Sequence, residues 1–277
     1  MKEKNIRHIL SLDGDGREVL VQGWIRTRRD SKGVSFLEIN DGSTINSIQV
    51  VLDHDVPGYN AIIPRLVNGA GVSIKGKLVP SQGTKQKVEV IPLEIDIYGD
   101  VPVDEYPLQK KRHSFEFLRE IAHLRPRTNT FGAVMRIRNA MSFAIHRYFN
   151  ENGFFYVHTP VITGSDCEGA GEMFRVTGFD LNNIPRVDGD IDFSKDFFEK
   201  EASLTVSGQL EAEIYALAMK NVYTFGPTFR AEKSNTSRHL AEFWMIEPEM
   251  AYCDINGNMD VAENFIKYIL RYVLENC

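Results

Sequence analysis

The stretch VYTFGPTFRAEKSNTSRHLAEFWMIEPEMAY (222–252) decides how the second half of this sequence folds. Side chains alternate in character on both sides of the polar run KSNTSRH, which predicts two antiparallel strands joined as a long hairpin. On the first strand, the alternation points Arg230 and Glu232 the same way. On the second strand, one face carries Trp244, Ile246, Pro248 and Met250, and the other carries Phe243, Met245, Glu247 and Glu249.

One face of this hairpin combines Arg230, Glu232 and Phe243. A guanidinium group can hold a phosphate, a carboxylate can accept from an exocyclic amine, and a phenyl ring can stack on a purine. ATP requires all three contacts, so the face predicts an ATP site. The alternative is an ordinary cross-strand ion pair between Arg230 and Glu232, which leaves Phe243 and the glutamates of the second strand unexplained.

The residues before the hairpin predict a helix, a strand and a loop. Apolar side chains recur on one stripe of FGAVMRIRNAMSFAIHRYFNENG (131–153), which indicates an amphipathic helix. The next run, FFYVHTPVI (154–162), predicts a strand interrupted by Pro160, and a proline inside a strand confines it to an edge or an interface, which favours dimerisation. The loop ITGSDCEGAGEMF (162–174) contains Glu168, which could receive an ammonium group from a ligand, although its composition also fits a surface turn.

A second helix precedes the hairpin directly. LTVS (204–207) predicts a short strand and GQLEAEIYALAMK (208–220) a helix, with Leu210, Ile214 and Leu217 expected to face the core. Gln209 and Glu213 are one turn apart, so they share a face near the start of this helix.

The first half of the sequence predicts a small β-barrel. Five segments rich in valine and isoleucine, separated by turn signals, are expected to form strands over 18–28, 34–39, 46–52, 71–79 and 88–98, with a short helix near 60–69. That order is typical of an OB-type barrel, whose open face receives single-stranded nucleic acid. Arg26, Arg28, Arg29 and Lys32 lead to Phe36, so cations could hold a backbone while the ring stacks a base. A solvated strand end with a core phenylalanine fits the same residues.

Composition limits the class of protein. The chain has 277 residues, 43% of them hydrophobic, and a formal net charge of −6, which excludes a uniformly basic coat for nucleic acid. Residues 1–100 carry 13 basic and 13 acidic side chains, whereas residues 126–277 carry 14 and 21. GDVPVDEYPLQKKRHS (99–114) has the composition of a linker, so we expect a barrel domain over 1–100, a linker over 101–125 and a second domain over 126–277. No long apolar run or secretory signal occurs, and three scattered cysteines fit reduced thiols, which together favour a cytoplasmic protein without membrane spans.

These motifs resemble the class II aminoacyl-tRNA synthetases. The helix with its Pro160 strand resembles their motif 1, and TFRAEKSNTSRHLAEF (228–243) resembles motif 2 as the asparaginyl-tRNA synthetases have it. LTVSGQLEAE (204–213) and GWIRTRRD (23–30) resemble the same family. The resemblance implies an α+β chain, in which an OB-type barrel for the anticodon precedes an antiparallel class II synthetase sheet with flanking helices.

The resemblance also assigns roles to positions of this sequence. In the ATP site it implies that Arg230 binds the α-phosphate and Glu232 the adenine amino group, that Phe243 stacks on adenine, and that Arg238 and His239 contact the remaining phosphates and the base. Arg230 and Glu232 would then be the catalytic residues. For the amino acid it implies Glu168 on the α-ammonium group, Gln209 as an orienting group and Glu213 at the side chain. For the anticodon it implies Arg29, Phe36 and Gln49.

The choice of amino acid follows from the chemistry of Glu213. The amide of asparagine offers two N–H donors and needs an acceptor, whereas aspartate needs a cation or a strong donor. Helix 208–219 contains no lysine or arginine, and an aspartate beside Glu213 would set two like charges together, so asparagine is favoured. An aspartate-specific or non-discriminating relative, and an RNA-binding module without catalysis, remain alternatives.

The implied reaction joins asparagine to its tRNA through an aminoacyl-adenylate, with ATP and Mg²⁺ required and a homodimer formed through the motif 1 helix and the Pro160 strand. Family members continue to a motif 3 that supplies a further arginine and carboxylates near magnesium. This sequence ends instead with NMDVAENFIKYILRYVLENC (258–277), so we expect a truncated form with little activity. The metal ligands stay unassigned, with Glu247 and Glu249 as candidates.

Overall fold

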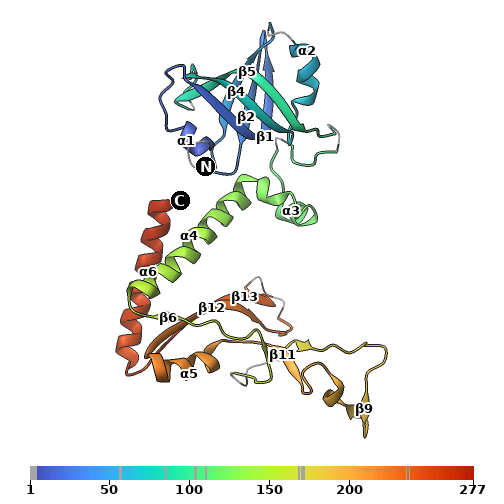
Figure 1. The fold of residues 1–277 in the computed structure, drawn as a ribbon, viewed down its shortest axis with the longest axis vertical. Helices are drawn as coiled ribbons and strands as arrows, with labels where there is room; N and C mark the ends of the chain where they lie inside the picture. Colours follow the sequence, from blue (N-terminus) through green and yellow to red (C-terminus); the bar gives the residue numbers. More distant parts are fainter. Residues whose placement is uncertain are drawn as a thin grey trace. The chain divides into compact units, whose positions relative to one another are not determined.

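A computed structural model of the chain describes residues 5–55, 58–84, 86–102, 105–109, 111–167, 169, 172–234, 236 and 238–277. The chain divides into two compact units, Met1–Arg136 and Ile137–Cys277. Figure 1 shows the helices and strands of both, and each unit is described below by itself. Among the described residues, no helix combines the length and the apolar composition that crossing a membrane requires.

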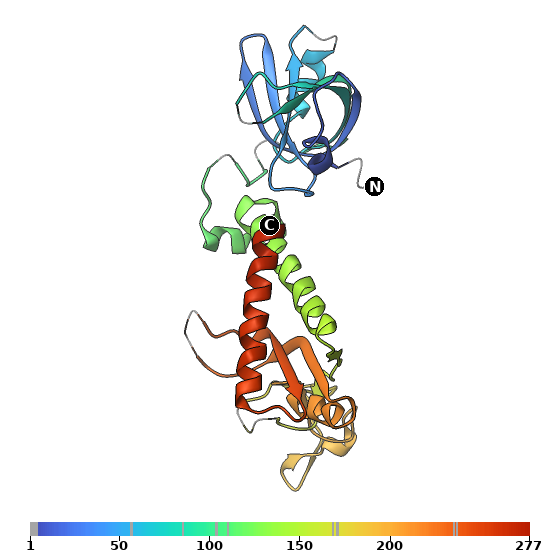
Figure 2. The same ribbon diagram turned by 90° about the vertical axis from the view of Figure 1, so that its left-hand side faces the viewer.

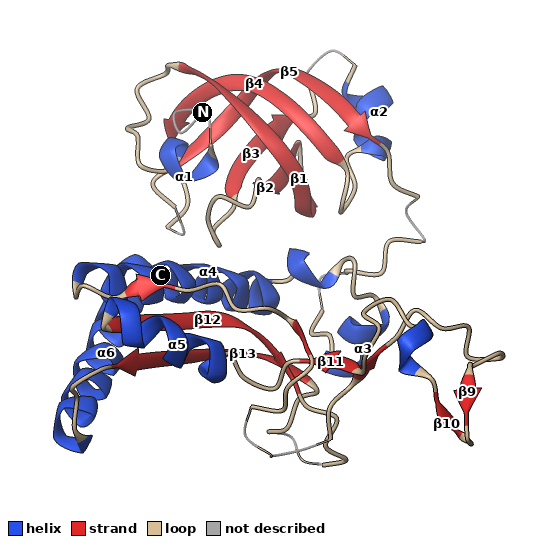
Figure 3. Cartoon of the chain, turned by 60° about the horizontal axis from the view of Figure 1, so that its bottom comes forward, coloured by secondary structure: helices blue, strands red, loops and turns tan. Residues whose placement is uncertain are grey.

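The N-terminal unit is built on a closed five-stranded barrel, as its sequence predicts. Its strands follow the order β1-β2-β3-β5-β4, and β3 pairs with β5 in parallel while the other pairs are antiparallel (Figure 3). Short helices lie before the barrel and after its third strand. The elements are α1 (Ile6–Ile9), β1 (Glu18–Ser31), β2 (Val34–Asn40), β3 (Ile48–Asp53), α2 (Tyr59–Ile62), the 3-10 helix η2 (Ile63–Arg65), β4 (Gly71–Pro80) and β5 (Val88–Gly99).

Alternation along the strands fills the barrel. One side chain in two points inward, and the resulting core consists of aliphatic residues that include Leu37, Ile39, Ile48 and Val50. The first strand carries an irregularity, because its pairing with β2 shifts register between Ile25 and Thr27. Such a bulge leaves one residue, here Arg26, opposite no partner and turns its side chain out of the regular alternation.

The barrel is followed by irregular chain and by the start of a long helix. The region 101–125 contains α3 (Phe115–Glu120), which Ser114 caps by accepting a hydrogen bond from the Phe117 N–H at 3.2 Å. A 3-10 turn, η3 (Arg125–Arg127), leads into α4 (Asn129–Glu151). The first turns of α4 belong to the N-terminal unit, where Arg136 donates a hydrogen bond to the carbonyl of Gly42 at 2.7 Å.

The C-terminal unit is built on a sheet of order β13-β12-β6. Its strands are β6 (Phe155–Tyr156), β12 (Asn221–Phe229) and β13 (Glu242–Met250), and β12 and β13 form the expected hairpin. α4 and α6 (Ile255–Asn276) run along one face of this sheet (Figures 1 and 2), where Tyr223, Phe225 and Ile246 pack on them. α5 (Gln209–Met219) covers the other face. The two faces of the hairpin therefore differ as the alternation predicts.

The remaining strands are short. β7 (Ile162–Thr163), β11 (Ala202–Leu204) and β8 (Arg175–Val176) form a second small sheet, and β9 (Arg186–Val187) and β10 (Asp190–Ile191) pair with each other before the 3-10 turn η4 (Phe193–Lys195). The strand predicted over 154–162, interrupted by Pro160, forms as two short strands, β6 and β7. β6 ends early, the Val157 N–H donates to the Tyr223 carbonyl at 2.9 Å, and Pro160, which has no N–H to donate, lies between β6 and β7.

The prediction for the buried side of the second helix is wrong. Leu210, Ile214 and Leu217 are 40%, 65% and 88% exposed, and Ala212 and Ala216 face the sheet instead. The small side chains let the helix lie close to Val222 of β12, and this contact determines the rotation of α5. Aliphatic periodicity alone selected the wrong face.

Candidate nucleotide, amino-acid and RNA sites

The hairpin face opposite α4 and α6 brings Arg230 and Phe243 together. Phe243 lies directly across the ladder from Thr228, and the pairing continues one step further because the Arg230 N–H donates to the Ala241 carbonyl at 3.0 Å. The guanidinium carbon of Arg230 lies 5.7 Å from the centroid of the Phe243 ring. A cation and an aromatic plane therefore stand side by side on one surface, and both side chains remain partly exposed.

The other residues assigned to the ATP site follow the strand instead of extending it. β12 ends at Phe229, and the Ala231 N–H donates to the Glu172 carbonyl at 2.8 Å, so Glu232 belongs to the loop and not to a continued strand. Arg238 and His239 also lie in this loop, and all three side chains are exposed.

A threonine organises the far side of the loop. The Thr236 hydroxyl accepts from the Arg238 N–H at 3.3 Å and hydrogen-bonds Nδ1 of His239. Thr236 thereby holds the backbone of Arg238 and the ring of His239 in the loop.

The start of α5 carries the two residues assigned to the amino acid. Nε2 of Gln209 donates to Oε1 of Glu213 at 3.0 Å, which confirms that they share a face. The same helix lies on the sheet face that carries Glu249, whose pKa is raised by burial and further by Glu213 and Glu247. Glu168, which the sequence assigns to the ammonium group, lies outside the described residues.

Glu247 has a structural task that the sequence did not reveal. Its carboxylate accepts from the Thr224 hydroxyl at 2.8 Å, from the Gly208 N–H at 3.2 Å, and from the Ser207 hydroxyl. The Ser207 oxygen in turn accepts from the Gln209 N–H at 3.1 Å. Glu247 thus joins the hairpin to the first N–H groups of α5, which lack a side-chain cap of their own.

Glu247 and Glu249, the candidate metal ligands, do not belong to a metal site among the described residues. In the part of the chain that the structure describes, no three histidine, cysteine, aspartate or glutamate side chains are grouped so that they could hold a metal ion. Both oxygens of Glu247 already accept hydrogen bonds. The described residues therefore do not fit a Mg²⁺ site, and no step is assigned to the ion.

The outer face of the barrel brings together the three residues assigned to the anticodon. Arg29 of β1 pairs in register with Phe36 of β2, and its guanidinium carbon lies 4.7 Å from the centroid of that ring. On β3, Nε2 of Gln49 donates to the buried carboxylate of Glu89 at 3.0 Å. Since its N–H₂ group is engaged there, the carbonyl oxygen of Gln49 can accept from a base. No pattern in the sequence indicates that Glu89 orients this amide.

Comparison with known proteins agrees with this geometry. The family model "tRNA synthetases class II (D, K and N)" matches residues 114–277, and "OB-fold nucleic acid binding domain" matches residues 19–98. The chain is 58% identical to the asparagine–tRNA ligase of Nostoc sp. and 57% identical to that of Synechocystis sp.. These alignments cover 100% of the chain but 60% of each relative, so the chain spans about three fifths of the length of these curated relatives.

A solved structure extends the comparison to three dimensions. The asparaginyl-tRNA synthetase from Pyrococcus horikoshii, complexed with asparaginyl-adenylate, superposes with a TM-score of 0.83 at 27% sequence identity. The superposition covers 99% of this chain and 59% of that one. The hairpin and barrel described above thus occur together in a known synthetase. The class II synthetase model matches residues 114–277, more than half of this chain, so the chain belongs to the class II tRNA synthetases of the D, K and N group.

Proposed function

We propose that this chain carries the anticodon-binding barrel and the ATP- and asparagine-binding elements of an enzyme that ligates asparagine to its tRNA. The relatives named above are asparagine–tRNA ligases, and the similar solved structure was complexed with asparaginyl-adenylate. The whole reaction belongs to the proposal because the chain spans 60% of the relatives' length. The observation that carries it is the contact of Arg230 with Phe243 on an open sheet face.

The reaction would proceed in two transfers. An oxygen of the asparagine α-carboxylate attacks the α-phosphorus of ATP, the bond from that phosphorus to the bridging oxygen breaks, and pyrophosphate leaves with the electron pair. A ribose hydroxyl of the 3′-terminal adenosine of tRNA then attacks the carbonyl carbon of the adenylate, its proton is released, and AMP leaves. Alignment and charge stabilisation suffice for such steps, so no side-chain nucleophile is required.

The hairpin would bind ATP. Arg230 would hold the α-phosphate and stabilise the charge that develops there, while Phe243 beside it would stack on adenine. Glu232 would accept from the adenine amino group. Arg238 and His239, both held by Thr236 in the loop, would contact the remaining phosphates. Mg²⁺ would arrive with ATP as part of the substrate.

α5 would select the amino acid. Glu213 would accept from the side-chain amide of asparagine, with Gln209 orienting the substrate and Glu168 receiving the ammonium group. The raised pKa of Glu249, caused by burial and by its neighbours Glu213 and Glu247, supports a negative environment at this end of the site. An aspartate side chain would meet like charge there, which favours asparagine.

The barrel would bind the anticodon. A base stacked on Phe36 would lie next to the Arg29 guanidinium, and Gln49 would present its carbonyl oxygen to a neighbouring base. In terms of domains, we assign anticodon binding to residues 1–100, a connecting segment to 101–125 and the synthetase core to 126–277.

Dimerisation through α4 and the chain around Pro160 is part of the proposal. Met141 on α4 and Phe155 and Tyr156 on β6 are 37%, 54% and 48% exposed, an apolar surface that a second copy of the chain would cover. The cytoplasm is the compartment that fits a translation enzyme.

The test is ligand binding to the 277-residue chain by calorimetry, because binding does not require the whole reaction. A non-hydrolysable asparaginyl-adenylate analogue should bind, and Arg230→Ala should weaken it at least tenfold. Arg271→Ala, which removes an exposed arginine from α6, is the matched control. Equal affinity in the wild type and Arg230→Ala, or no binding to either, would refute the ATP site. Tighter binding of the aspartyl analogue would refute the choice of asparagine.

A further inference from the structure

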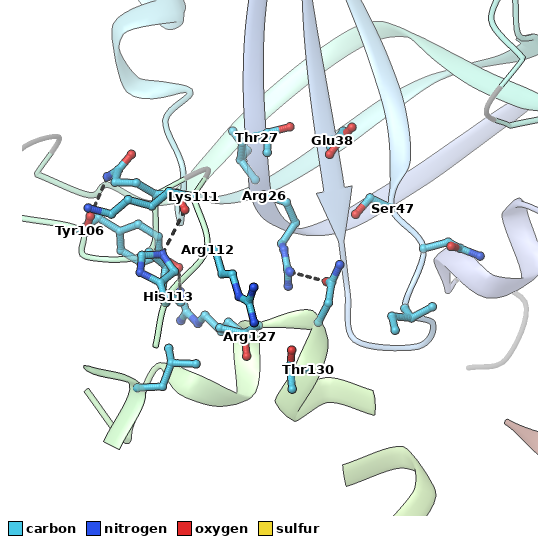
Figure 4. A pocket seen from close by; sticks show the side chains of 18 of the residues that line it. Arg26, Thr27, Glu38, Ser47, Tyr106, Lys111, Arg112, His113, Arg127 and Thr130 are labelled. Atoms are coloured by element: carbon cyan, nitrogen blue, oxygen red, sulfur yellow. Dashed lines mark hydrogen bonds between the residues drawn. The ribbon is translucent and has the colours of Figure 1, made fainter. Parts of the chain in front are cut away.

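A cavity of about 1380 Å³ in the N-terminal unit is lined by residues of the barrel strands, of segment 106–118 and of the first turn of α4 (Figure 4). Gln49, which is assigned to the anticodon, is one of its lining residues, so the cavity belongs to the barrel site already described. In the C-terminal unit, the hydrogen bonds of Ser207 and Glu247 lead further, into the part of the chain assigned to the amino acid.

A chain of hydrogen bonds runs from β13 to the residues of α5 assigned to the amino acid. The Ser207 hydroxyl donates to Oε1 of Glu247 and accepts from the Gln209 N–H at 3.1 Å. The side chain of Gln209 then donates from Nε2 to Oε1 of Glu213 at 3.0 Å. Each link begins at the residue where the previous link ends. We call this series, Glu247, Ser207, Gln209 and Glu213, the α5 relay.

The Glu247 end of the relay is fixed to the sheet. Glu247 and Thr224 lie directly opposite each other in the ladder, and the Thr224 hydroxyl donates to Oε2 of Glu247 at 2.8 Å. The Gly208 N–H donates to the same oxygen at 3.2 Å. Ser207 and Thr224 are 1% and 3% exposed, so water does not compete for their hydrogen bonds. A Cβ at Gly208 would lie 3.1 Å from Cγ2 of Thr224, so the chain that begins α5 lies directly on β12.

The turn that carries Ser207 is held independently of α5. Oγ1 of Thr205 donates to the Ser207 carbonyl at 2.6 Å and accepts from the Ser207 N–H at 3.3 Å. The Thr205 carbonyl accepts from the Phe229 N–H at 2.9 Å, and the Thr205 N–H donates to the Val161 carbonyl at 2.8 Å. The Ser207 hydroxyl is therefore a fixed point, from which the backbone of Gln209 is held.

The Glu213 end of the relay keeps one acceptor for a ligand. In the described part of the chain, hydrogen bonding to Glu213 is confined to Oε1, so Oε2 can accept from the side-chain amide of asparagine. Glu213 is exposed, and an exposed glutamate without a partner samples several rotamers. The hydrogen bond from Gln209 selects one of them before the ligand arrives, which lowers the entropic cost of binding.

Repulsion between carboxylates gives the relay a further task. Burial raises the pKa of Glu249, and the charges of Glu213 and Glu247 raise it further, so these three carboxylates lie near one another. A Glu213 side chain released by Gln209 would turn away from like charge and toward solvent. The relay opposes that movement.

We propose that Ser207 and Glu247 are positioning residues that set the affinity for the amino-acid substrate, by holding Gln209 and, through it, the acceptor Glu213. The inference rests on the proposed function, because asparagine is taken to bind at Glu213. Neither Ser207 nor Glu247 touches the substrate in this role. The relay does not include Arg230 or Phe243, so its loss should leave the binding of ATP unchanged.

Calorimetric titration of the 277-residue chain with two ligands separates the two parts of the site. The ligands are the non-hydrolysable asparaginyl-adenylate analogue and α,β-methylene-ATP. Ser207→Ala removes the middle of the relay and should weaken the asparaginyl-adenylate analogue about tenfold, the effect of one hydrogen bond to a charged group. Its affinity for α,β-methylene-ATP should stay within about twofold of the wild type, a difference between ligands that a general loss of folding would not produce.

Tyr148→Phe is the matched control. It also removes one buried hydroxyl group from the C-terminal unit, but the hydrogen bond that is lost, to the Val261 carbonyl at 3.3 Å, lies on the side of the sheet that packs on α4 and α6. Both ligands should bind this variant as they bind the wild type.

A double-variant cycle tests the connection between the two residues. Glu247→Gln should weaken the asparaginyl-adenylate analogue when it is introduced alone. In the Ser207→Ala background it should cause a smaller further loss, because the link to Gln209 is already broken. Losses that simply multiply in the double variant would show that the two residues act independently, and would overturn the relay.

The outcomes also separate this inference from the proposed function. If the wild type binds neither ligand, or if Arg230→Ala binds both ligands as tightly as the wild type, the proposed function fails and the relay fails with it. If Arg230→Ala weakens both ligands but Ser207→Ala and Glu247→Gln bind the asparaginyl-adenylate analogue normally, only the relay is wrong.

Two further results would overturn the relay alone. Equal losses for both ligands in Ser207→Ala would show that the hydroxyl serves folding, and a loss of the asparaginyl-adenylate analogue in Tyr148→Phe would show that any buried hydroxyl has the same effect. Urea unfolding establishes that each variant is folded. If Ser207→Ala is not, the comparison of the two ligands in Glu247→Gln decides, and normal binding of the asparaginyl-adenylate analogue there refutes the inference.

Discussion

Replacing Glu247 by alanine should destabilise the C-terminal unit by about 3 kcal/mol. The carboxylate accepts three hydrogen bonds, and each bond to a charged group contributes about 1.5–3 kcal/mol, with less than additive effect. Its loss strands the hydroxyl groups of Ser207 and Thr224, which are 1% and 3% exposed. Glu247→Gln keeps the shape and one acceptor, so we expect a smaller loss of about 1–2 kcal/mol.

Urea unfolding followed by tryptophan fluorescence measures this difference, because each unit contains one of the two tryptophans. Trp24 lies in the barrel and Trp244 in the hairpin, so a Trp24→Phe background makes the signal report on the C-terminal unit alone. Glu242→Ala is the matched control, since Glu242 is an exposed carboxylate of the same strand on the opposite face, and a change within about 0.5 kcal/mol is expected. Equal losses for Glu247→Ala and Glu242→Ala would refute the role of Glu247.

Three further outcomes are expected. Phe36→Ala should weaken binding of an RNA stem-loop that carries an asparagine anticodon by about 1–3 kcal/mol in a titration, and an unchanged affinity would exclude stacking on this ring. Burial, Glu213 and Glu247 raise the pKa of Glu249 in the folded state, so the free energy of unfolding should fall as the pH rises from 4.5, the pKa of this carboxyl group in the unfolded chain, through the raised folded pKa. Glu249→Gln should remove that fall when unfolding is measured over a pH series. A parallel fall in the variant would contradict the assignment. Gly208→Ala should destabilise the C-terminal unit, because a Cβ there would lie 2.7 Å from the Thr159 hydroxyl oxygen. Gly226→Ala is the control, since a Cβ at that position would meet no atom within 4 Å. Equal melting temperatures of the two variants would contradict tight packing at Gly208.

Local patterns predicted the parts of this molecule that depend on neighbouring residues in sequence. The two-residue alternation of 222–252 determines which side chains share a face, and the contact between Arg230 and Phe243 follows from it. The barrel strands follow from the same rule and from their turn residues. The family resemblance supplied the roles of individual residues, which alternation by itself does not contain.

Features that depend on the approach of distant segments were not predictable. The rotation of α5 depends on the size of Ala212 and Ala216 against β12, although larger aliphatic residues dominate its periodicity. The partners of Glu247 come from β12 and from the chain before α5, so no spacing in the sequence reveals them. The one-residue bulge at Arg26 depends on the pairing of β1 with β2, and sequence patterns do not mark it.

The alanine contact between α5 and the sheet bears on how substrate preference could diverge. Enlarging Ala212 or Ala216 would push the whole helix outward, so the backbone that carries Gln209 and Glu213 has little freedom to shift. A descendant enzyme that uses a different amino acid as its substrate would therefore retain the position of α5 and exchange the side chains on the surface that faces the substrate. Selection for altered specificity should accordingly enrich replacements at Glu213 while the two alanines stay fixed.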